Sequence, residues 1–349
     1  MKITFACFDS VSIDHGGALV QVLETKRELE ALGITVSLFD RWKPFSPAET
    51  DLVHIFAARY STFQMAMTMH LLDVPFVTSS IFFTQHSASV IRNALRIEKM
   101  LKRFRSSIWT DYGYTRQICD WSEAVLPNTH DEADLIRCGM GIPAEKITVI
   151  PNGVDRRFEN ADPGLFVKTY GVKDFILNVG HIGPGRKNVL GLIHALETIN
   201  HPAVIIGRIT KDAAGAACVA EAAKNKNMLL IPGLANDSEM LASAYAACDT
   251  FVLPSLFETP GIAALEAGLA GAKIVITPHG GTRDYFGSMA HYAAPHSVES
   301  IRNAITQALS EPKTSGLRDH IRREFLWSTV AQKTAAVYQS VISKRSNRA

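Results

Sequence analysis

The sequence is poor in cysteine and arranges what it has without a pattern. Five cysteines occur in 349 residues, and none forms a Cys-x-x-Cys pair: Cys7, Cys119, Cys138, Cys218 and Cys248. An odd number of scattered cysteines indicates neither a disulfide framework nor a zinc site. A reducing compartment is therefore expected.

Long apolar runs are also missing. No stretch approaches the ~18 apolar residues that a membrane-spanning helix requires. The first residues, MKITFACFDSVSIDHGG, contain one early lysine and an apolar run only as long as a strand, which does not match a secretory signal peptide. We therefore expect a cytoplasmic protein, or one attached peripherally to the inner face of the plasma membrane.

Charge of one sign does not dominate. Lysine and arginine number 36 against 34 aspartates and glutamates, which gives a net charge of +2. This balance disfavours a protein that holds nucleic acid by bulk charge, so no nucleic-acid partner is expected.

The chain does contain a regular alternation of short apolar runs with helical patterns. At about 150 residues per domain, its length predicts two domains. Strand–helix alternation predicts α/β domains with parallel sheets covered by helices on both faces. The expected strands are 2–8, 35–39, 52–56, 76–83, 123–128 and 147–152 in the first half, and 175–180, 203–207, 228–233, 250–255 and 273–277 in the second.

Residues 151–174 interrupt this pattern. The segment PNGVDRRFENADPGLFVKTYGVKD is rich in Gly, Pro, Asn and Asp, as linkers are. It predicts a boundary near residue 165 between two doubly wound domains. A ligand is expected in a crevice between them, at the carboxyl ends of the strands.

Two acids in an apolar segment indicate what that ligand is. Glu258 and Glu266 are separated by seven residues, and Thr259-Pro260-Gly261 predicts a helix start, with Thr as cap and Pro at the first helical position. The helix is expected to continue to about Ala270. A carboxylate can accept two hydrogen bonds from the vicinal hydroxyls of a ribose, which favours a nucleotide-sugar site.

A different arrangement of these acids remains open. Glu266 would then pair with an internal arginine, for which Arg283 is the candidate, and Glu258 would face solvent.

Glycines and cations at strand ends add to the site. Gly180 ends an expected strand, and Arg186-Lys187 follow in the loop before a helix, where they would neutralise a diphosphate. A surface basic pair is the alternative. Gly16-Gly17 lie between the first strand and its helix and allow close approach of a phosphate or sugar. They are not part of a Gly-x-Gly-x-x-Gly motif, so a dehydrogenase-type domain is disfavoured.

Taken in order, these motifs resemble the retaining glycosyltransferases of family 4, the glycosyl transferases of group 1. The resemblance runs through Gly16-Gly17, SEAVLPNTHDEADLI, VIPNGVD, FILNVGHIGPGRKN, LIPGLANDSEMLASAYAACDTFVLPS and FETPGIAALE. It implies the GT-B fold, in which two doubly wound Rossmann-like domains face each other across a cleft. The implied domains are an acceptor domain at 1–165, a donor domain at 166–325, and a terminal helix at 326–349 that packs back on the first domain.

The resemblance also implies roles for particular residues. Glu266 would hold the ribose, and Glu258 would face the transferred sugar beside Pro260 and the N–H groups of Gly261 and Ile262. Lys187 would bind the diphosphate with Arg186 nearby. Further donor contacts fall at the remaining strand ends: Gly16, Gly17, Gly180, His181, Gly233 and Leu234.

Two positions depart from the family pattern. The family usually has Arg directly after the strand-end glycine, where this chain has His181. The cationic clamp would then need Arg186 as a substitute or a protonated His181. Many relatives place a histidine after the fourth strand, near the reacting sugar, whereas this chain has His86 some residues later. His86 is a catalytic candidate, and a hydrogen-bonded surface or interdomain histidine is the alternative. His54 is expected to be a satisfied strand histidine.

The implied reaction moves a hexose from a nucleoside-diphosphate sugar, UDP, GDP or ADP, to a glycan or lipid-linked acceptor with retention. Cell-surface polysaccharide or lipopolysaccharide assembly would be its setting. No cofactor or metal is implied, since the sequence has no Asp-x-Asp pair. The alternatives are a non-catalytic sugar-nucleotide-binding scaffold subunit and a sugar-nucleotide epimerase.

Residues 88–109 belong to a basic amphipathic segment that predicts one helix over 86–109. Ile97, Leu101, Phe104 and Ile108 would line one side, and Arg92, Arg96, Lys99 and Arg103 another. Such a helix suits an anionic leaflet that carries a lipid-linked acceptor. The alternative is a helix that packs its apolar side on the core and exposes its basic side.

Overall fold

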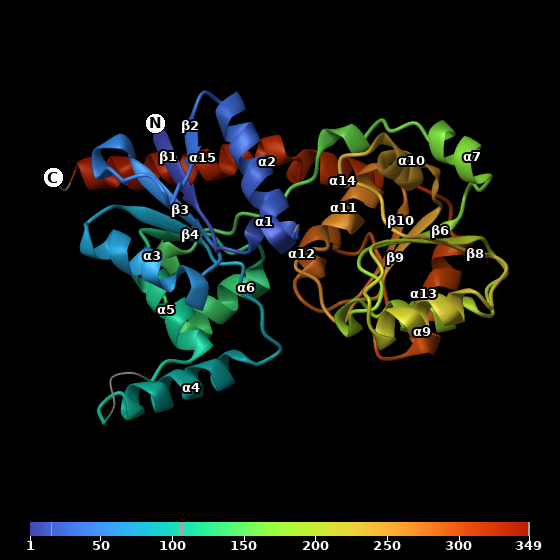
Figure 1. Cartoon of the computed structure of the whole chain (residues 1–349), viewed down its shortest axis with the longest axis horizontal. Helices are drawn as coiled ribbons and strands as arrows, with labels where there is room; N and C mark the ends of the chain where they lie inside the picture. The colour runs from blue at the N-terminus through green and yellow to red at the C-terminus, as the bar shows by residue number, and fades with distance from the viewer. Residues whose placement is uncertain (15, 105–107, 348–349) are drawn as a thin grey trace. The chain divides into compact units, whose positions relative to one another are not determined.

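The computed structural model describes residues 1–14, 16–104 and 108–347, and the chain forms two compact units (Figure 1). The first unit is Met1–Gly153 together with Trp327–Ala349, and the second unit is Val154–Leu326. The break falls at Gly153–Val154, whereas the sequence pattern placed it near residue 165. Val154, Phe158 and Phe166 explain the difference, because all three are buried in the core of the second unit.

The first unit contains a five-stranded parallel sheet in the order β2-β1-β3-β4-β5. Its strands are β1 (Lys2–Ala6), β2 (Thr35–Leu38), β3 (Leu52–Phe56), β4 (Phe76–Ser79) and β5 (Ala124–Val125). Every residue of β3 is buried, which accounts for the unbroken apolar run LVHIF. The strand expected over 147–152 is wrong, since Ile147 makes only an isolated bridge to Val125.

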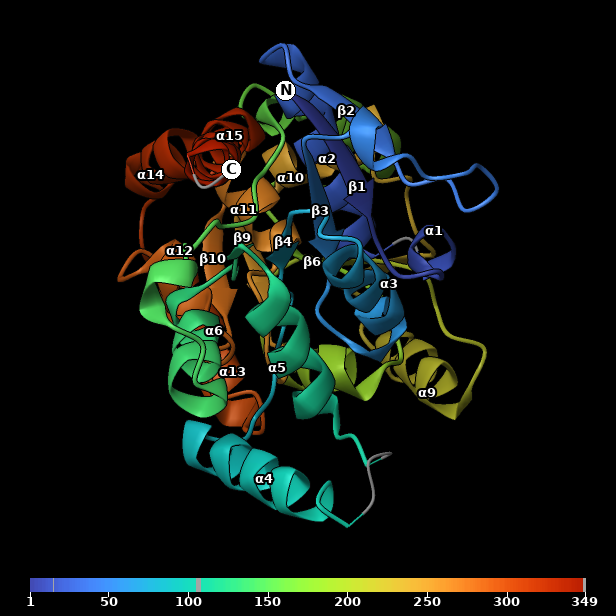
Figure 2. The ribbon, with the colours of Figure 1, turned by 90° about the vertical axis from the view of Figure 1, so that its left-hand side faces the viewer.

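Helices flank this sheet in the chain order that the pattern predicted. They are α1 (Val11–Asp14), α2 (Gly17–Ala31), α3 (Tyr60–Leu71), α4 (Ala88–Leu101), α5 (Asp111–Trp121), α6 (His130–Asp134) and α15 (Trp327–Ser346), with short turns at Pro47–Glu49, Leu135–Gly139 and Ala144–Lys146. The chain reverses after α2 at Gly33, whose φ of 79° lies in the left-handed region that glycine tolerates best. Figures 1 and 2 show α4 at the margin of the unit, away from the sheet.

The C-terminal helix α15 completes the core of the first unit. Trp327, Val330 and Tyr338 are buried among Phe5, Leu29 and Leu52. A Cβ on Gly153 would lie 2.5 Å from the Trp327 ring, so only glycine fits there. His54 on β3 is buried and shares hydrogen bonds with Tyr338 Oη at 2.5 Å and Ser79 Oγ at 2.9 Å. This confirms the expectation of a satisfied strand histidine.

The second unit contains a six-stranded parallel sheet in the order β11-β10-β9-β6-β7-β8. Its strands are β6 (Ile176–Val179), β7 (Ala203–Ile206), β8 (Met228–Ile231), β9 (Thr250–Leu253), β10 (Lys273–Ile276) and β11 (His291–Tyr292). Its helices are α7 (Gly164–Tyr170), α8 (Val189–Leu196), α9 (Ala213–Ala222), α10 (Glu239–Ala247), α11 (Ile262–Leu269), α12 (Thr282–Phe286), α13 (Val298–Ser310) and α14 (Gly316–Glu324), with short turns at Arg156–Phe158 and Gly185–Lys187. The predicted α/β class with parallel sheets is thus confirmed in both units.

No helix among the described residues is both long enough and apolar enough to cross a membrane.

Candidate functional site

The candidate site lies where parallel strands of the second unit end together. Because β6, β7, β8 and β9 share one direction, the segments after their carboxyl ends gather at one edge of the sheet. These segments carry Gly180 and His181 after β6, Gly207 and Arg208 after β7, Gly233 after β8, and Glu258 after β9.

The loop between β6 and α8 is fixed to the loop after β9. Asn188 has a φ of 52°, and its side-chain amide donates to the carbonyls of Pro254 at 3.1 Å and Pro295 at 2.7 Å. The N–H of Leu256 donates to the carbonyl of Arg186 at 2.8 Å. These contacts hold the cations of one loop beside the carboxylate of the other.

Glu258 is the acid of this arrangement. Its side chain is buried, and Lys187 Nζ lies 2.6 Å from Oε1 while Arg186 Nη1 lies 3.5 Å from it. The alternative in which Glu258 faces solvent is therefore wrong. The backbone N–H of Glu258 donates a hydrogen bond to the carbonyl of His279 at 3.0 Å. Gly280 packs closely there, since a Cβ at that position would lie 2.4 Å from the Glu258 carbonyl oxygen.

Helix α11 begins later than the sequence predicted. Gly261, with a φ of 85°, is the N-cap and Ile262 the first helical residue, so Thr259 does not cap the helix and Pro260 is not its first residue. Thr259 and Pro260 are joined by a cis peptide bond and form the bend before the helix. Within the described chain, the N–H groups of Gly261 and Ile262 have no hydrogen-bond acceptor. They supply the positive end of a helix dipole next to Glu258.

Glu266, about one turn into α11, is buried and accepts a hydrogen bond from Tyr245 Oη at 2.7 Å. Burial raises the pKa of Glu266 to about 7, although the Tyr245 hydrogen bond and the charge of Arg157 oppose the rise. The pairing with Arg283 is not observed, because the Arg283 guanidinium lies over the Tyr292 ring at 4.2 Å.

His181 and Arg208 extend two neighbouring strands. The register of β6 on β7 pairs Val179 with Ile206, and the bridge between Ile182 and Ile209 continues that register beyond the strands. His181 and Arg208 are thereby opposite each other. Burial and the charges of Arg208, Lys187 and Arg186 hold the pKa of His181 below its usual value, so His181 is neutral near pH 7.

Gly180, Gly233 and Leu234 lie at the same edge of the sheet. A Cβ on Gly180 would lie 3.9 Å from Lys187 Cδ, which places the lysine stem beside the strand end. Gly233 has a φ of 99°, and a Cβ there would lie 3.6 Å from the backbone nitrogen of Arg208. The Leu234 side chain packs against the core of the second unit.

Three predicted residues lie in the first unit. Gly16 is the N-cap of α2 and Gly17 its first residue, and both are exposed. His86 is exposed in the segment before α4, with Nδ1 at 2.6 Å from Tyr112 Oη. That is the hydrogen-bonded surface arrangement that the sequence left as the alternative.

Sequence reasoning missed several polar residues. Arg208 had a signal, because it directly follows a strand-end glycine. Tyr245 and Arg157 had none, since each reaches Glu266 from an element distant in sequence. Glu132 on α6 was also missed. It is buried, accepts hydrogen bonds from Ser80 Oγ and the N–H groups of Phe82 and Asn128, and burial raises its pKa to about 7.

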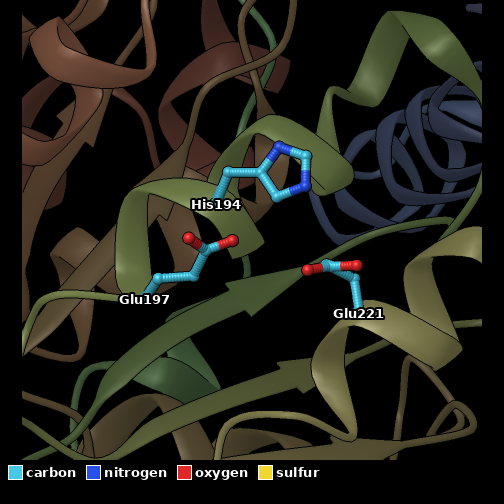
Figure 3. A group of neighbouring side chains, drawn as sticks. All are labelled: His194, Glu197 and Glu221. Atoms are coloured by element: carbon cyan, nitrogen blue, oxygen red, sulfur yellow. The ribbon is translucent and has the colours of Figure 1, made fainter.

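A separate cluster with metal-ligand spacing lies at the end of α8, on the residue that follows it and on α9 (Figure 3). His194, Glu197 and Glu221 bring their ligand atoms within 4.8 Å of one another. Lys224 Nζ lies 2.7 Å from Glu221, so a cation of the chain itself already balances charge there. The candidate site is at the start of α8, whereas His194 is in the last turn of that helix. The cluster therefore lies at the other end of α8 and is not part of the site.

Comparison with known proteins assigns families to both units. The model of glycosyl transferases group 1 matches residues 167–324, and the model of Glycosyltransferase Family 4 matches residues 45–158.

Individual relatives agree with these matches. A D-inositol 3-phosphate glycosyltransferase of Stackebrandtia nassauensis is 25% identical, with 95% of this chain and 88% of the relative aligned. An uncharacterized glycosyltransferase of Methanocaldococcus jannaschii is 28% identical over 56% of this chain, which spans only 55% of that relative. Most of the alignments with curated relatives are similarly partial.

A solved structure with a similar fold is that of Anabaena HepE in complex with UDP and glucose. It superposes with a TM-score of 0.67 over 97% of this chain and all of that chain, at 19% identity. This likeness confirms the GT-B fold.

Proposed function

Because this chain belongs to the glycosyl transferases of group 1 and family 4, we propose that it transfers a hexose from a nucleoside-diphosphate sugar to a hydroxyl acceptor with retention of configuration. The observation that carries the proposal is the grouping of Glu258, Lys187 and Arg186 beside the unpaired N–H groups that start α11. Cations and helix N–H groups suit a diphosphate, and a buried carboxylate suits sugar hydroxyls.

The proposed chemistry needs electrostatic stabilisation above all. The bond from the anomeric carbon to the diphosphate breaks, a bond to the acceptor oxygen forms on the same face, and the departing phosphate oxygen accepts the acceptor proton. Lys187 and Arg186 offset the charge that develops on the leaving group. Glu258 orients the sugar and Glu266 the ribose, so neither acts as the general acid of a glycosidase pair. The proposed reaction uses no metal, because side-chain cations already face the diphosphate position.

The relatives support the kind of donor. The HepE structure contains UDP and glucose, so UDP-glucose is the first donor to test, followed by GDP- and ADP-sugars. We propose a glycan or lipid-linked acceptor in cell-surface polysaccharide or lipopolysaccharide assembly.

Donor hydrolysis is the direct test. Purified protein is incubated with each nucleotide sugar, and released nucleotide and sugar are quantified with and without acceptor glycans. Slow release that Lys187→Ala and Glu258→Ala both abolish supports the transferase, provided that the variants keep the thermal midpoint of the wild type. Binding without turnover across a broad acceptor panel would favour the scaffold, and isomerised donor without free nucleotide would favour the epimerase.

We further propose that α4 places the enzyme on an anionic bilayer. The described part of this segment ends its helix at Leu101, so the helix expected over 86–109 is too long, and Ile108 does not extend its apolar side. Residues 105–107 lie outside the described residues. The apolar side is exposed to solvent, with Val90, Ile97 and Phe104 at 46%, 54% and 82% exposure. The alternative in which this side packs on the core is therefore wrong.

The positive charges on α4 favour an anionic membrane as the partner of its apolar side. At 100° per residue, Arg92, Arg96 and Lys99 form one exposed stripe of α4, and Val90, Ile97 and Leu101 form an exposed apolar stripe on another side. Arg103 and Phe104 are exposed in the turn that follows the helix. Ile91 and Glu98 face the unit instead, and both are buried. A cavity of about 220 Å³ opens on the basic side, and its lining includes Arg92, Arg96, Lys99 and Arg116 together with Leu95 and residues 138–141. Apolar side chains beside cations match the interface of an anionic membrane.

Vesicle flotation tests this surface. Wild type should float with vesicles of phosphatidylglycerol and phosphatidylethanolamine and remain unbound with phosphatidylcholine alone. Ile97→Asp and the pair Arg96→Glu with Lys99→Glu should each abolish flotation. The exposed pair Lys211→Glu with Lys226→Glu makes the same charge change in the second unit and should not. Equal flotation of all variants, or α4-dependent dimers without vesicles, would refute the membrane surface.

A further inference from the structure

Arg208 stands at the candidate site without an assigned role. We propose that Arg208 supplies a third cation for the donor diphosphate, beside Lys187 and Arg186, at the end of the strand next to the one where the family pattern places an arginine. This inference rests on the proposed transferase function and names one residue of its diphosphate site.

The geometry places Arg208 opposite the position that lacks the family arginine. The carbonyl of Arg208 accepts a hydrogen bond from the N–H of Ile182 at 3.0 Å, and the carbonyl of Ile206 accepts one from the N–H of Gly180 at 3.0 Å. A Cβ on Gly207 would lie 1.6 Å from the Gly180 carbonyl oxygen. Glycine at 207 therefore lets the end of β7 approach the end of β6, and this approach puts Arg208 beside His181.

His181 cannot supply the missing charge itself. Burial, and after it the charges of Arg208, Lys187 and Arg186, lower the pKa of His181 and favour its neutral form. The cationic clamp therefore depends on arginine and lysine side chains.

Arg208 is also available for a ligand. It is exposed, and no hydrogen bond or ion pair to its side chain occurs among residues 1–14, 16–104 and 108–347. Lys187 and Arg186, by contrast, share Glu258. Arg208 thus adds a cation that forms no ion pair with an acid in the part of the chain that the structure describes.

The position of Arg208 along the sheet edge fits a nucleoside diphosphate. The strand order β6-β7-β8 puts it between His181 and Gly233, which follow the strands on either side. An arginine there can make two parallel hydrogen bonds to phosphate oxygens. Its neighbours at Lys187 and Gly233 would contact the other phosphate and the base.

A rescue experiment separates this role from a structural one. Binding of UDP, GDP and ADP is measured by calorimetry for wild type, Arg208→Ala, His181→Arg and the double variant. For the base that binds, the nucleoside alone is measured as well. We expect Arg208→Ala to weaken the binding of the nucleoside diphosphate at least tenfold and to leave nucleoside binding unchanged. We also expect the affinity for the diphosphate to depend less on salt concentration in this variant than in the wild type. We expect His181→Arg to restore binding in the double variant to within threefold of wild type.

Arg156→Ala is the matched control. Arg156 is an exposed arginine of the same unit, and its removal should not change binding. Unchanged diphosphate binding in Arg208→Ala would overturn the proposal, as would an equal loss of nucleoside binding or a loss that His181→Arg does not restore. If wild type binds no nucleoside diphosphate, the proposed function fails and this inference fails with it. The thermal midpoint of each variant shows that the unit is folded.

Discussion

Replacing Glu258 by glutamine should tighten the binding of free nucleoside diphosphate while slowing sugar transfer. In the structure Lys187 donates to Glu258 over 2.6 Å, and the two side chains are 19% and 7% exposed. A diphosphate must compete with this carboxylate for the lysine. The variant keeps the shape of the side chain and a neutral acceptor, but it releases the charge of Lys187.

The size of the effect follows from the strength of the contact. A hydrogen bond to a charged partner is worth about 1.5–3 kcal/mol, and one between neutral groups about 0.5–1.5 kcal/mol. The variant therefore weakens the contact by the difference between these ranges, about 1–1.5 kcal/mol. Since 1.4 kcal/mol corresponds to a factor of ten, we expect UDP to bind about five- to tenfold more tightly.

Calorimetric titration with UDP and a coupled assay for sugar transfer measure the two effects separately. Asp249→Asn is the control, because Asp249 and Lys273 form an ion pair of the same unit, 3.0 Å apart and 20% and 12% exposed. Removing that acid should not alter UDP affinity. Weaker or unchanged UDP binding in Glu258→Gln would refute competition for Lys187, and undiminished transfer would refute the contact between Glu258 and the sugar.

Three further outcomes follow from individual contacts. Burial raises the pKa of Glu266 to about 7, and ribose hydroxyls donate hydrogen bonds to its ionised form. Nucleotide affinity measured by calorimetry should therefore rise from about pH 6 to pH 8 and then level off. Glu266→Gln should remove this pH dependence. Tyr338→Phe removes a partner of buried His54 and should lower the stability of the first unit by about 1–3 kcal/mol in urea titrations; unchanged unfolding would contradict that role. Gly207→Ala would press a methyl group on the Gly180 carbonyl and should weaken diphosphate binding in the same calorimetric assay.

Much of the fold was accessible from local sequence. Continuous apolar strands such as LVHIF predict burial on both faces, and β3 is buried throughout. The run ITVIPN carries the same signal and lies along the end of β5, where the N–H groups of Thr148 and Ile150 donate to the carbonyls of Val125 and Pro127. It forms only an isolated bridge between Ile147 and Val125 and no strand. The length over which an apolar segment pairs with a sheet depends on the neighbouring strand, here the two-residue β5, which the segment's own sequence does not encode.

The site was accessible in part. The residue types of Glu258, Lys187 and Arg186 indicated a place for a charged sugar donor, but their mutual contact did not follow from local pattern. Glu258 lies 71 residues after Lys187, and the two meet only because β9 is adjacent to β6. Arg208 had a local signal in the strand-end glycine before it, but its alignment with His181 requires the register between β6 and β7.

The division of α4 into three faces needed the structure as well. Its apolar stripe was visible in the sequence, but an apolar stripe can equally face a core. Only the burial of Ile91 and Glu98 on a different side shows which face the unit already covers.

The return of the chain to the first unit at Trp327 sets an order for folding on the ribosome. The second unit is a continuous segment from Val154 to Leu326, so all of its strands have been synthesised before α15 emerges. The first unit, although synthesised earlier, lacks the side of its core that Trp327 and Tyr338 fill until the last helix leaves the exit tunnel. The later part of the nascent chain can thus finish folding first, while the earlier part waits with apolar surface that a chaperone would have to shield.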